Sequence, residues 1–363
     1  MRCLRINYDN IQMEEPYDIN KFINCLLLLR EPSCTLADVE LHCTLHDGGE
    51  YVDFWIRHAL LCQAQMLCIY IICSEDCYVF DGPPLVSRHL RRLKLRNVEF
   101  VVNFLDFSSC SQLEDLRIEN CCIGSSRILS QSVKHLVIDD CLFEDDEKTQ
   151  LISVPNLISL QFIECRGRTP LFESMMSLET AVVRLNGYND SWFWLSEECE
   201  EDICVKGHAG ECCGTCAVCC GYGDHGDRCV LLEGLSSATS LELVAASRLL
   251  IFRRDLRWCP TFSKLKTLLL SEWCVQVDLR GLVCMLEHSP VLENLTLTFR
   301  KQGKTTRTLE VEGNSSLMEK PAAISGYLKI IKVECEEIDV RVCKVLKFLS
   351  ILDMEIIIKR TSR

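Results

Sequence analysis

One stretch of the sequence, residues 199–229, is the richest in side chains that could do chemistry. Its candidate metal ligands are Cys212, Cys213, Cys216, Cys219, Cys220 and His225. Two overlapping C-x-x-C pairs, 213/216 and 216/219, have the spacing that lets two thiolates bind one tetrahedral zinc ion. A structural zinc site usually takes two separate pairs, and here the second pair overlaps the first. We therefore predict a Gly- and Cys-rich surface insertion without metal, with zinc binding and a redox or disulfide role as the alternatives.

The sequence contains none of the common enzyme motifs. There is no G-x-S-x-G nucleophile elbow, no Gly-rich phosphate loop followed by Lys-Ser/Thr, and no H-E-x-x-H zinc motif. His58 fits a partly exposed helix position better than a general base. The acidic run at 144–147 lacks the alternating spacing of a calcium loop, so a solvated turn is favoured. The sequence therefore predicts a protein that is not an enzyme.

Charge and hydropathy exclude several classes of partner. The chain has 363 residues and a formal net charge of −13, from 39 Lys+Arg against 52 Asp+Glu. This balance repels phosphate backbones, so we expect no nucleic-acid partner. The apolar run at 25–29 is far short of the roughly 20 residues that span a membrane, and the N-terminal residues lack the apolar core of a signal peptide. We expect no membrane association and an intracellular protein, cytoplasmic or nuclear, with reduced cysteines.

A repeated leucine pattern predicts the elements that must position any site. The pattern is L-x-x-L-x-L, and its middle anchors in the clearest block are Leu93, Leu116, Leu136 and Leu160. Their spacing lies within the period of leucine-rich repeats, about 20–29 residues. A cysteine ends three successive copies, at Cys121, Cys141 and Cys165. Its side chain can hydrogen-bond the backbone as the chain leaves the strand, or simply fill the turn.

Weaker copies extend the pattern in both directions. They are centred on Leu4, Val39, Ile69, Leu241, Leu268, Leu295 and Ile331. One repeat cannot bury its own apolar face, so stacked repeats should form a curved parallel sheet with helical return segments, two of them over 53–63 and 277–289. The predicted fold class is α/β, a leucine-rich-repeat solenoid. The alternative is an ordinary α/β protein with leucine-rich buried strands.

Two interruptions divide the predicted solenoid. We expect repeats over 1–185, a Gly/Cys-rich insertion over 186–234, repeats over 235–299, a polar loop over 300–327 and a β-α-β cap over 328–363. In the cap, Asp339 is placed to cap a helix that runs to about Ser350.

Side chains between the leucine anchors should point outward, onto the concave side of the solenoid. In the clearest block these candidate partner-binding residues are Arg92, Lys94, Arg96, Asp115, Arg117, Glu119, His135 and Asp139. Their charge starts basic and becomes mixed along the row.

Several segments resemble plant F-box/LRR proteins with an FBD-type C-terminal region. They are residues 104–121, 166–185, 229–245, 252–274 and 288–297, together with the tail VECEEIDVRVCKVLKFLS. The resemblance implies a non-enzymatic recognition module, similar to the substrate receptors of SCF-type cullin–RING ubiquitin ligases. In such receptors an F-box holds a Skp-type adaptor and the repeats present a target protein, whose identity is unknown for this chain.

The chain departs from that family at its N-terminus. Family members carry a helical F-box ahead of the repeats, and residues 1–60 contain no recognisable one. The resemblance therefore implies binding of a Skp-type adaptor and cullin only if an F-box is supplied upstream. Two alternatives are a non-functional truncated receptor and a zinc-binding repeat scaffold whose activity lies in residues 199–229.

Overall fold

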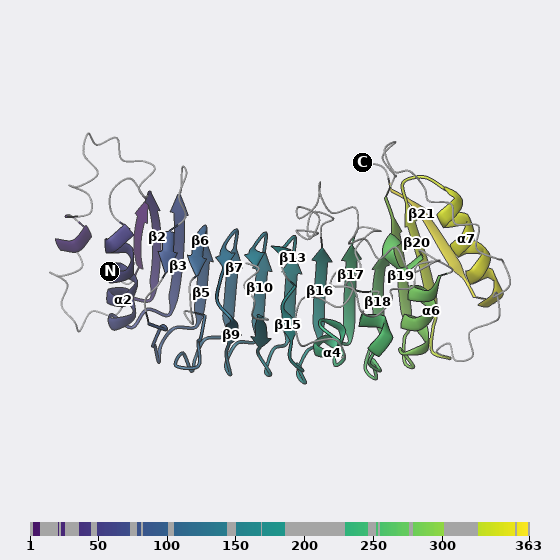
Figure 1. Cartoon of the computed structure of the whole chain (residues 1–363), viewed down its shortest axis with the longest axis horizontal. Coiled ribbons are helices and arrows are strands. Elements are labelled where there is room, and N and C mark those ends of the chain that lie inside the picture. Colours follow the sequence, from purple (N-terminus) through teal and green to yellow (C-terminus); the bar gives the residue numbers. More distant parts are fainter. Residues whose placement is uncertain are drawn as a thin grey trace, which may run out of the picture. The chain divides into compact units, whose positions relative to one another are not determined.

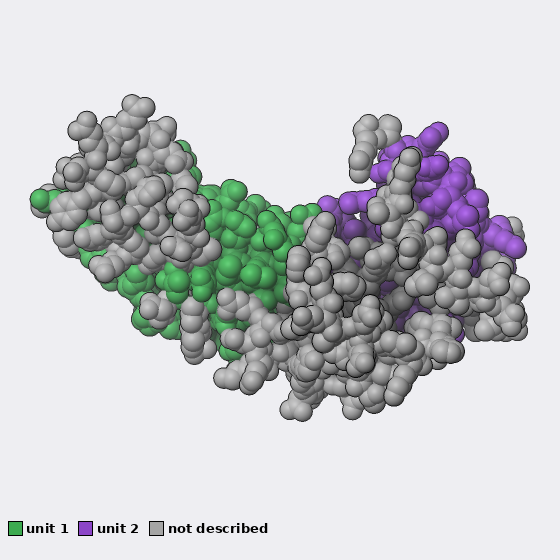
Figure 2. Space-filling view, turned by 45° about the horizontal axis from the view of Figure 1, so that its top comes forward, with its two compact units in different colours: residues 1–176 green, residues 177–363 purple. Residues whose placement is uncertain are grey.

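The computed structural model shows an α/β chain with a large parallel sheet and few helices (Figure 1). It describes residues 3–7, 21, 23–25, 36–44, 49–72, 78–80, 83–100, 105–143, 150–167, 169–185, 229–245, 252, 255–275, 279–300, 326–352 and 354–361. The chain divides into two compact units, Met1–Met176 and Ser177–Arg363, coloured separately in Figure 2. Among the helices of the described ranges, none has both the length and the apolar character needed to cross a membrane.

The first unit contributes seven strands to the large sheet. They are β1 (Cys3–Asn7), β2 (Asp38–Thr44), β3 (Met66–Ile72), β5 (Arg92–Arg96), β7 (Asp115–Glu119), β10 (His135–Asp139) and β13 (Ser159–Ile163). Each pairs in parallel with the next one named. The prediction of adjacent parallel strands centred on the four clearest anchors is therefore confirmed.

The leucine anchors lie side by side across these strands. Leu93, Leu116, Leu136 and Leu160 pair in register, and each is at most 2% exposed. The anchor predicted for β3 was wrong by two residues, because Leu67 and not Ile69 pairs with Leu93. Residues 67, 69 and 71 all share the buried face of β3, so a period of two leaves the pattern ambiguous by two residues.

The central repeats of the first unit return through short strands. One set forms a five-stranded sheet from β4 (Tyr78–Phe80), β6 (Val98–Phe100), β8 (Cys122–Ile123), β11 (Leu142–Phe143) and β14 (Arg166–Gly167). A second set forms a three-stranded sheet from β9 (Arg127–Leu129), β12 (Leu151–Ser153) and β15 (Leu171–Phe172). The prediction of helical returns was wrong here, since β-branched and aromatic residues such as Val98 and Phe100 favour strands. It is confirmed for α2 (Gly49–Leu61).

In the large sheet, β5, β7, β10 and β13 are each followed by a left-handed residue that turns the chain into its return. These residues are Asn97, Asn120, Asp140 and Glu164, with φ between 48° and 59°. Asn and Asp tolerate this conformation better than other non-glycine residues, because their short polar side chains can bond locally. Asn120 Nδ2 donates to Asn97 Oδ1 at 2.7 Å, which links two successive turns.

The cysteines that end three of the repeats have both of the roles considered for them. Cys121, Cys141 and Cys165 are buried, and each Sγ donates to the carbonyl oxygen two residues earlier at 3.1–3.4 Å. Each also reaches a carbonyl of the preceding repeat, at 3.5–3.7 Å. Burial raises the pKa of the Cys121 and Cys165 thiols, which keeps them protonated as donors.

The second unit contributes the other six strands of the large sheet. They are β16 (Thr180–Leu185), β17 (Ser240–Ala245), β18 (Thr267–Ser271), β19 (Asn294–Phe299), β20 (Ile330–Cys335) and β21 (Ile356–Arg360), again parallel in this order. Its helical segments are α4 (Leu232–Leu235), η4 (Leu256–Trp258), η5 (Glu272–Val275), α6 (Arg280–Glu287), α7 (Val340–Leu349) and η6 (Ser350–Leu352).

Two predictions for the second unit are confirmed. The helix expected over 277–289 is α6, and the C-terminal β-α-β is β20, α7 and β21. Asp339 caps α7, because its Oδ1 accepts the backbone N–H of Val342 at 3.0 Å. The buried residues of α7 are Val342, Val345, Phe348 and Leu349.

Candidate functional site

The eight candidate partner-binding residues lie together on one face of the first unit. We call them the outward row; they form three rungs, Arg92–Asp115–His135, Lys94–Arg117 and Arg96–Glu119–Asp139, across β5, β7 and β10. Their neighbours along each strand are buried apolar anchors, so strand alternation turns these side chains away from the core. Arg92, Arg96, Arg117 and His135 are exposed, and the other four are half-buried.

Charge is only partly neutralised along the outward row. The Glu119 carboxylate forms ion pairs with Lys94 Nζ at 2.9 Å and with Arg117 Nη1 at 3.3 Å. Asp139, beside Glu119 in the same rung, has a pKa raised by its burial and then by the charge of Glu119. Within the described ranges no cation forms an ion pair with Asp139, and Arg92 and Arg96 form none with an acid. The row thus presents both signs of charge that are free to meet a partner.

An aromatic pair extends the outward row onto β3 and β2. Tyr70 stacks on His42 with ring centroids 4.4 Å apart, and Lys94 Nζ lies 5.3 Å from the centre of the Tyr70 ring. His42 Nε2 in turn lies 2.9 Å from Glu40 Oε1. These residues lie outside the predicted row, because that row was based only on the clearest repeats. The signal was present, since Tyr70 alternates with buried Ile69 and Ile71 in β3.

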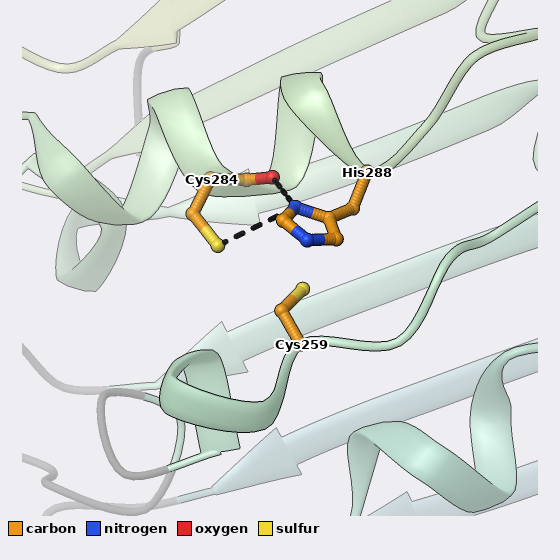
Figure 3. Close-up of side chains that lie close together, drawn as sticks. All are labelled: Cys259, Cys284 and His288. Atoms are coloured by element: carbon orange, nitrogen blue, oxygen red, sulfur yellow. Dashed lines mark hydrogen bonds between the residues drawn. The ribbon is translucent and has the colours of Figure 1, made fainter.

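A second candidate site lies wholly in the second unit and was not predicted. Cys259, Cys284 and His288 bring two thiols and an imidazole together, with their ligand atoms within 4.8 Å of one another (Figure 3). Cys259 follows η4, Cys284 lies in α6 and His288 caps the end of α6. All three are half-buried. We call them the Cys/His cluster.

Backbone contacts hold the two segments of the Cys/His cluster against each other. The Phe262 N–H donates to the carbonyl oxygen of His288 at 2.8 Å. Cys284 Sγ contacts the carbonyl oxygen of Leu256 at 3.8 Å.

Buried Asp255, at the start of η4, accepts hydrogen bonds from the backbone N–H groups of residues 230, 231 and 232 at 2.7–3.0 Å. The start of α4 is thereby tied to the segment that carries Cys259.

The two thiols of the Cys/His cluster differ in acidity. A hydrogen bond from Cys259, aided by the nearby His288, lowers the pKa of Cys284 to about 7, against the opposing effect of burial. The same hydrogen bond raises the pKa of Cys259, and burial raises it further. Near neutral pH, Cys259 therefore stays protonated and its S–H donates a hydrogen bond to the Cys284 thiolate. Such a thiolate is the form in which cysteine binds metals or acts as a nucleophile.

The metal ligands considered from the sequence lie outside the described residues. These are Cys212, Cys213, Cys216, Cys219, Cys220 and His225. The last residues of the predicted insertion are described, and Cys229 to Leu232 are buried in the second unit. Burial, then the charge of Asp255, raises the pKa of Cys229. The Cys/His cluster was not predicted because Cys259 and Cys284 are far apart in sequence. The one signal present in the sequence was the C-x3-H spacing of Cys284 and His288 on a predicted helix.

Comparison of the chain with protein-family models, with curated proteins and with solved structures gives no match. Any functional assignment therefore rests on the residues and geometry described above.

Proposed function

We propose that this chain is a non-enzymatic protein-recognition module, a leucine-rich-repeat solenoid that binds a partner protein through the outward row. The observation that carries the proposal is that Arg92 and Arg96 on β5, and Asp139 two strands away on β10, lie in the rungs of the outward row with no ion-pair partner among the described residues. Buried leucines fix the backbone beneath them, so binding requires no ordering of that backbone.

The repeat geometry supports the solenoid part of the proposal. From β5 to β13, each repeat adds one strand to the large sheet, and most add strands to two smaller parallel sheets as well. Stacked units of this kind, each contacting only its neighbours, are typical of solenoid proteins. The resemblance to F-box/LRR proteins further supports a role like that of an SCF-type ligase substrate receptor, with the outward row holding the target.

The row also has the composition of a protein-binding surface. Interfaces use complementary charge to select a partner and to speed its approach, and tyrosine and arginine often supply much of the affinity. Tyr70, stacked on His42 and next to Lys94, provides an aromatic centre beside the charged rungs. We expect the partner surface to carry acidic groups facing Arg92 and Arg96 and a basic group facing Asp139.

The test is charge reversal with a matched control. Arg92→Glu combined with Arg96→Glu should weaken binding of a partner captured by the wild-type chain at least tenfold, because it places like charges face to face. The control, Lys266→Glu with Lys329→Glu, changes the net charge equally but acts on exposed lysines of the second unit that pair with Glu293. Equal loss of binding in both variants, or no loss in either, would refute the outward row as the recognition surface.

A further inference from the structure

We propose that Cys259, Cys284 and His288 bind one zinc ion in the second unit. The site is independent of the outward row. It also differs from the zinc-ligand candidates in residues 199–229, since it uses none of those residues.

The three side chains have the chemistry and separation that zinc requires. Two thiolates and one imidazole are common zinc ligands, with bonds of about 2.3 Å to sulfur and 2.0–2.1 Å to nitrogen. A tetrahedral ion therefore needs roughly 3.8 Å between sulfurs and roughly 3.6 Å between sulfur and nitrogen. The ligand atoms here all lie within 4.8 Å of one another. Small side-chain rotations would bring them around one ion.

The imidazole is already held in the form that binds metal. His288 Nδ1 lies 2.9 Å from the carbonyl oxygen of Cys284, which can only accept a hydrogen bond, so Nδ1 carries the proton. In the neutral ring Nε2 then keeps its lone pair. Figure 3 shows this second ring nitrogen turned toward Cys259. Zinc-binding histidines usually donate their other N–H to a carbonyl or carboxylate in this way, which fixes the ring.

A second Cys/His pair in the chain shows what the proposed site adds. In and just after α2, Cys62 Sγ lies 3.5 Å from His58 Nδ1, with the same spacing of four residues. Among the described residues no further thiol, imidazole or carboxylate completes a group of three around that pair. At α6 the third ligand, Cys259, comes from a different segment. The group at α6 therefore joins two separate segments, the residue after η4 and the helix α6, whereas the pair at α2 is a contact within one segment.

Zinc binding would join the residues around η4 to the end of α6. Each thiol that binds exchanges its S–H bond for an S–Zn bond and releases the proton to solvent. Two thiolates balance the charge of Zn²⁺, and the three protein ligands leave the fourth position to water. Because the ion binds the folded arrangement only, it should stabilise the second unit.

The experiment measures zinc bound to the full reduced chain. The chain is stripped with chelator, titrated with Zn²⁺, passed through gel filtration and assayed by elemental analysis. We expect Cys284→Ser and His288→Gln each to lose one equivalent of zinc relative to the wild type. Cys62→Ser, the matched control, should lose none. Replacing both Cys213 and Cys216 by Ser should also leave this equivalent bound, which separates the site from residues 199–229.

A second readout guards against a variant that simply unfolds. Cobalt bound in place of zinc reports thiolate ligands through a charge-transfer band, and circular dichroism reports folding of the same sample. A folded Cys284→Ser chain with a weaker thiolate–cobalt band would support the site. The proposal is overturned if the wild type binds no zinc, or if folded Cys284→Ser and His288→Gln chains keep the full wild-type amount.

Discussion

The central strands of the two units bury the same kind of apolar side chain, but their outward side chains are very different. On β5, β7 and β10 the inward positions are leucine or isoleucine, and every outward residue except His135 and Val137 is charged. On β17, β18 and β19 the inward positions are all leucine apart from the strand ends. Their outward residues include Ser240, Glu242, Val244, Thr267, Leu269, Asn294, Thr296 and Thr298. Glu242 is the one charged residue of that set, and Arg184 pairs with it at 2.6 Å.

This difference shows which side chains the fold requires, the inward apolar ones, and which it does not, the outward charged ones. Both units need apolar side chains on the inward face of the sheet, because the burial of these side chains stabilises the fold. Neither unit needs charge on the other face, so the charges of the first unit are available for the recognition that we propose. The comparison therefore supports recognition by the first unit rather than by the second.

The largest effect should come from charging the inward face of either unit. Leu116→Asp and Leu268→Asp each bury a carboxylate with no cation to meet it, at a cost of several kcal/mol. The milder Leu116→Ala and Leu268→Ala should each cost about 2–5 kcal/mol through the cavity they leave. Urea titrations followed by circular dichroism would measure these losses. A unit that tolerates its Asp variant would break the equivalence of the two inward faces.

A polar anchor distinguishes the second unit and should give the next largest loss. Asp255 is fully buried and accepts three backbone N–H groups where the chain enters α4. Asp255→Ala leaves these donors unpaired, so the free energy of unfolding should fall by about 3 kcal/mol or more. Asp255→Asn keeps one acceptor oxygen, so its free energy of unfolding should lie between that of the alanine variant and that of the wild type. Equal stability of all three chains would show that these hydrogen bonds contribute nothing.

The cap of α7 should give a smaller, pH-dependent effect. Asp339→Ala should cost about 1 kcal/mol near neutral pH. Burial raises the pKa of Asp339, but hydrogen bonds from Arg341 and the Val342 N–H outweigh it and lower the pKa below its ordinary value. A lowered carboxyl pKa stabilises the fold above the unfolded pKa and loses that effect as pH falls through the folded pKa.

Stability measured from neutral pH down to about pH 3 would therefore show the wild type converging on Asp339→Ala, beginning near the unfolded pKa of about 3.9. If the stability difference between the wild type and Asp339→Ala stays constant over this pH range, the charge of Asp339 does not contribute to the cap.

The smallest effect should come from trimming the outward row. Arg117→Ala removes an exposed side chain that shares Glu119 with Lys94, so stability should change by less than about 0.5 kcal/mol. Thr296→Ala, at the equivalent middle position of β19, should behave alike. A melting-temperature loss for Arg117→Ala as large as that for Leu116→Ala would contradict the assignment of inward and outward faces.

Repetition explains why much of the fold could be predicted. The spacing of Leu93, Leu116 and Leu136 repeats closely enough to fix strand position and order, and Asp339 was recognisable as a cap from the apolar face that follows it. Two things were not encoded in that spacing. The register of β3 was ambiguous because Leu67, Ile69 and Ile71 are all apolar, and the Cys/His cluster joins segments that meet only once the chain is folded.

The most direct test of recognition by the first unit is photo-cross-linking from matched outward positions. A photoreactive residue is placed at Arg117 in one chain and at Thr296 in another, and each is exposed to the same partner extract. We expect the Arg117 probe to capture a defined protein, and salt present during irradiation should reduce that capture, because charge drives the contact. The Thr296 probe should not capture that protein. If the Thr296 probe captures the same protein equally well, or if only the Thr296 probe captures it, recognition by the outward row of the first unit is contradicted.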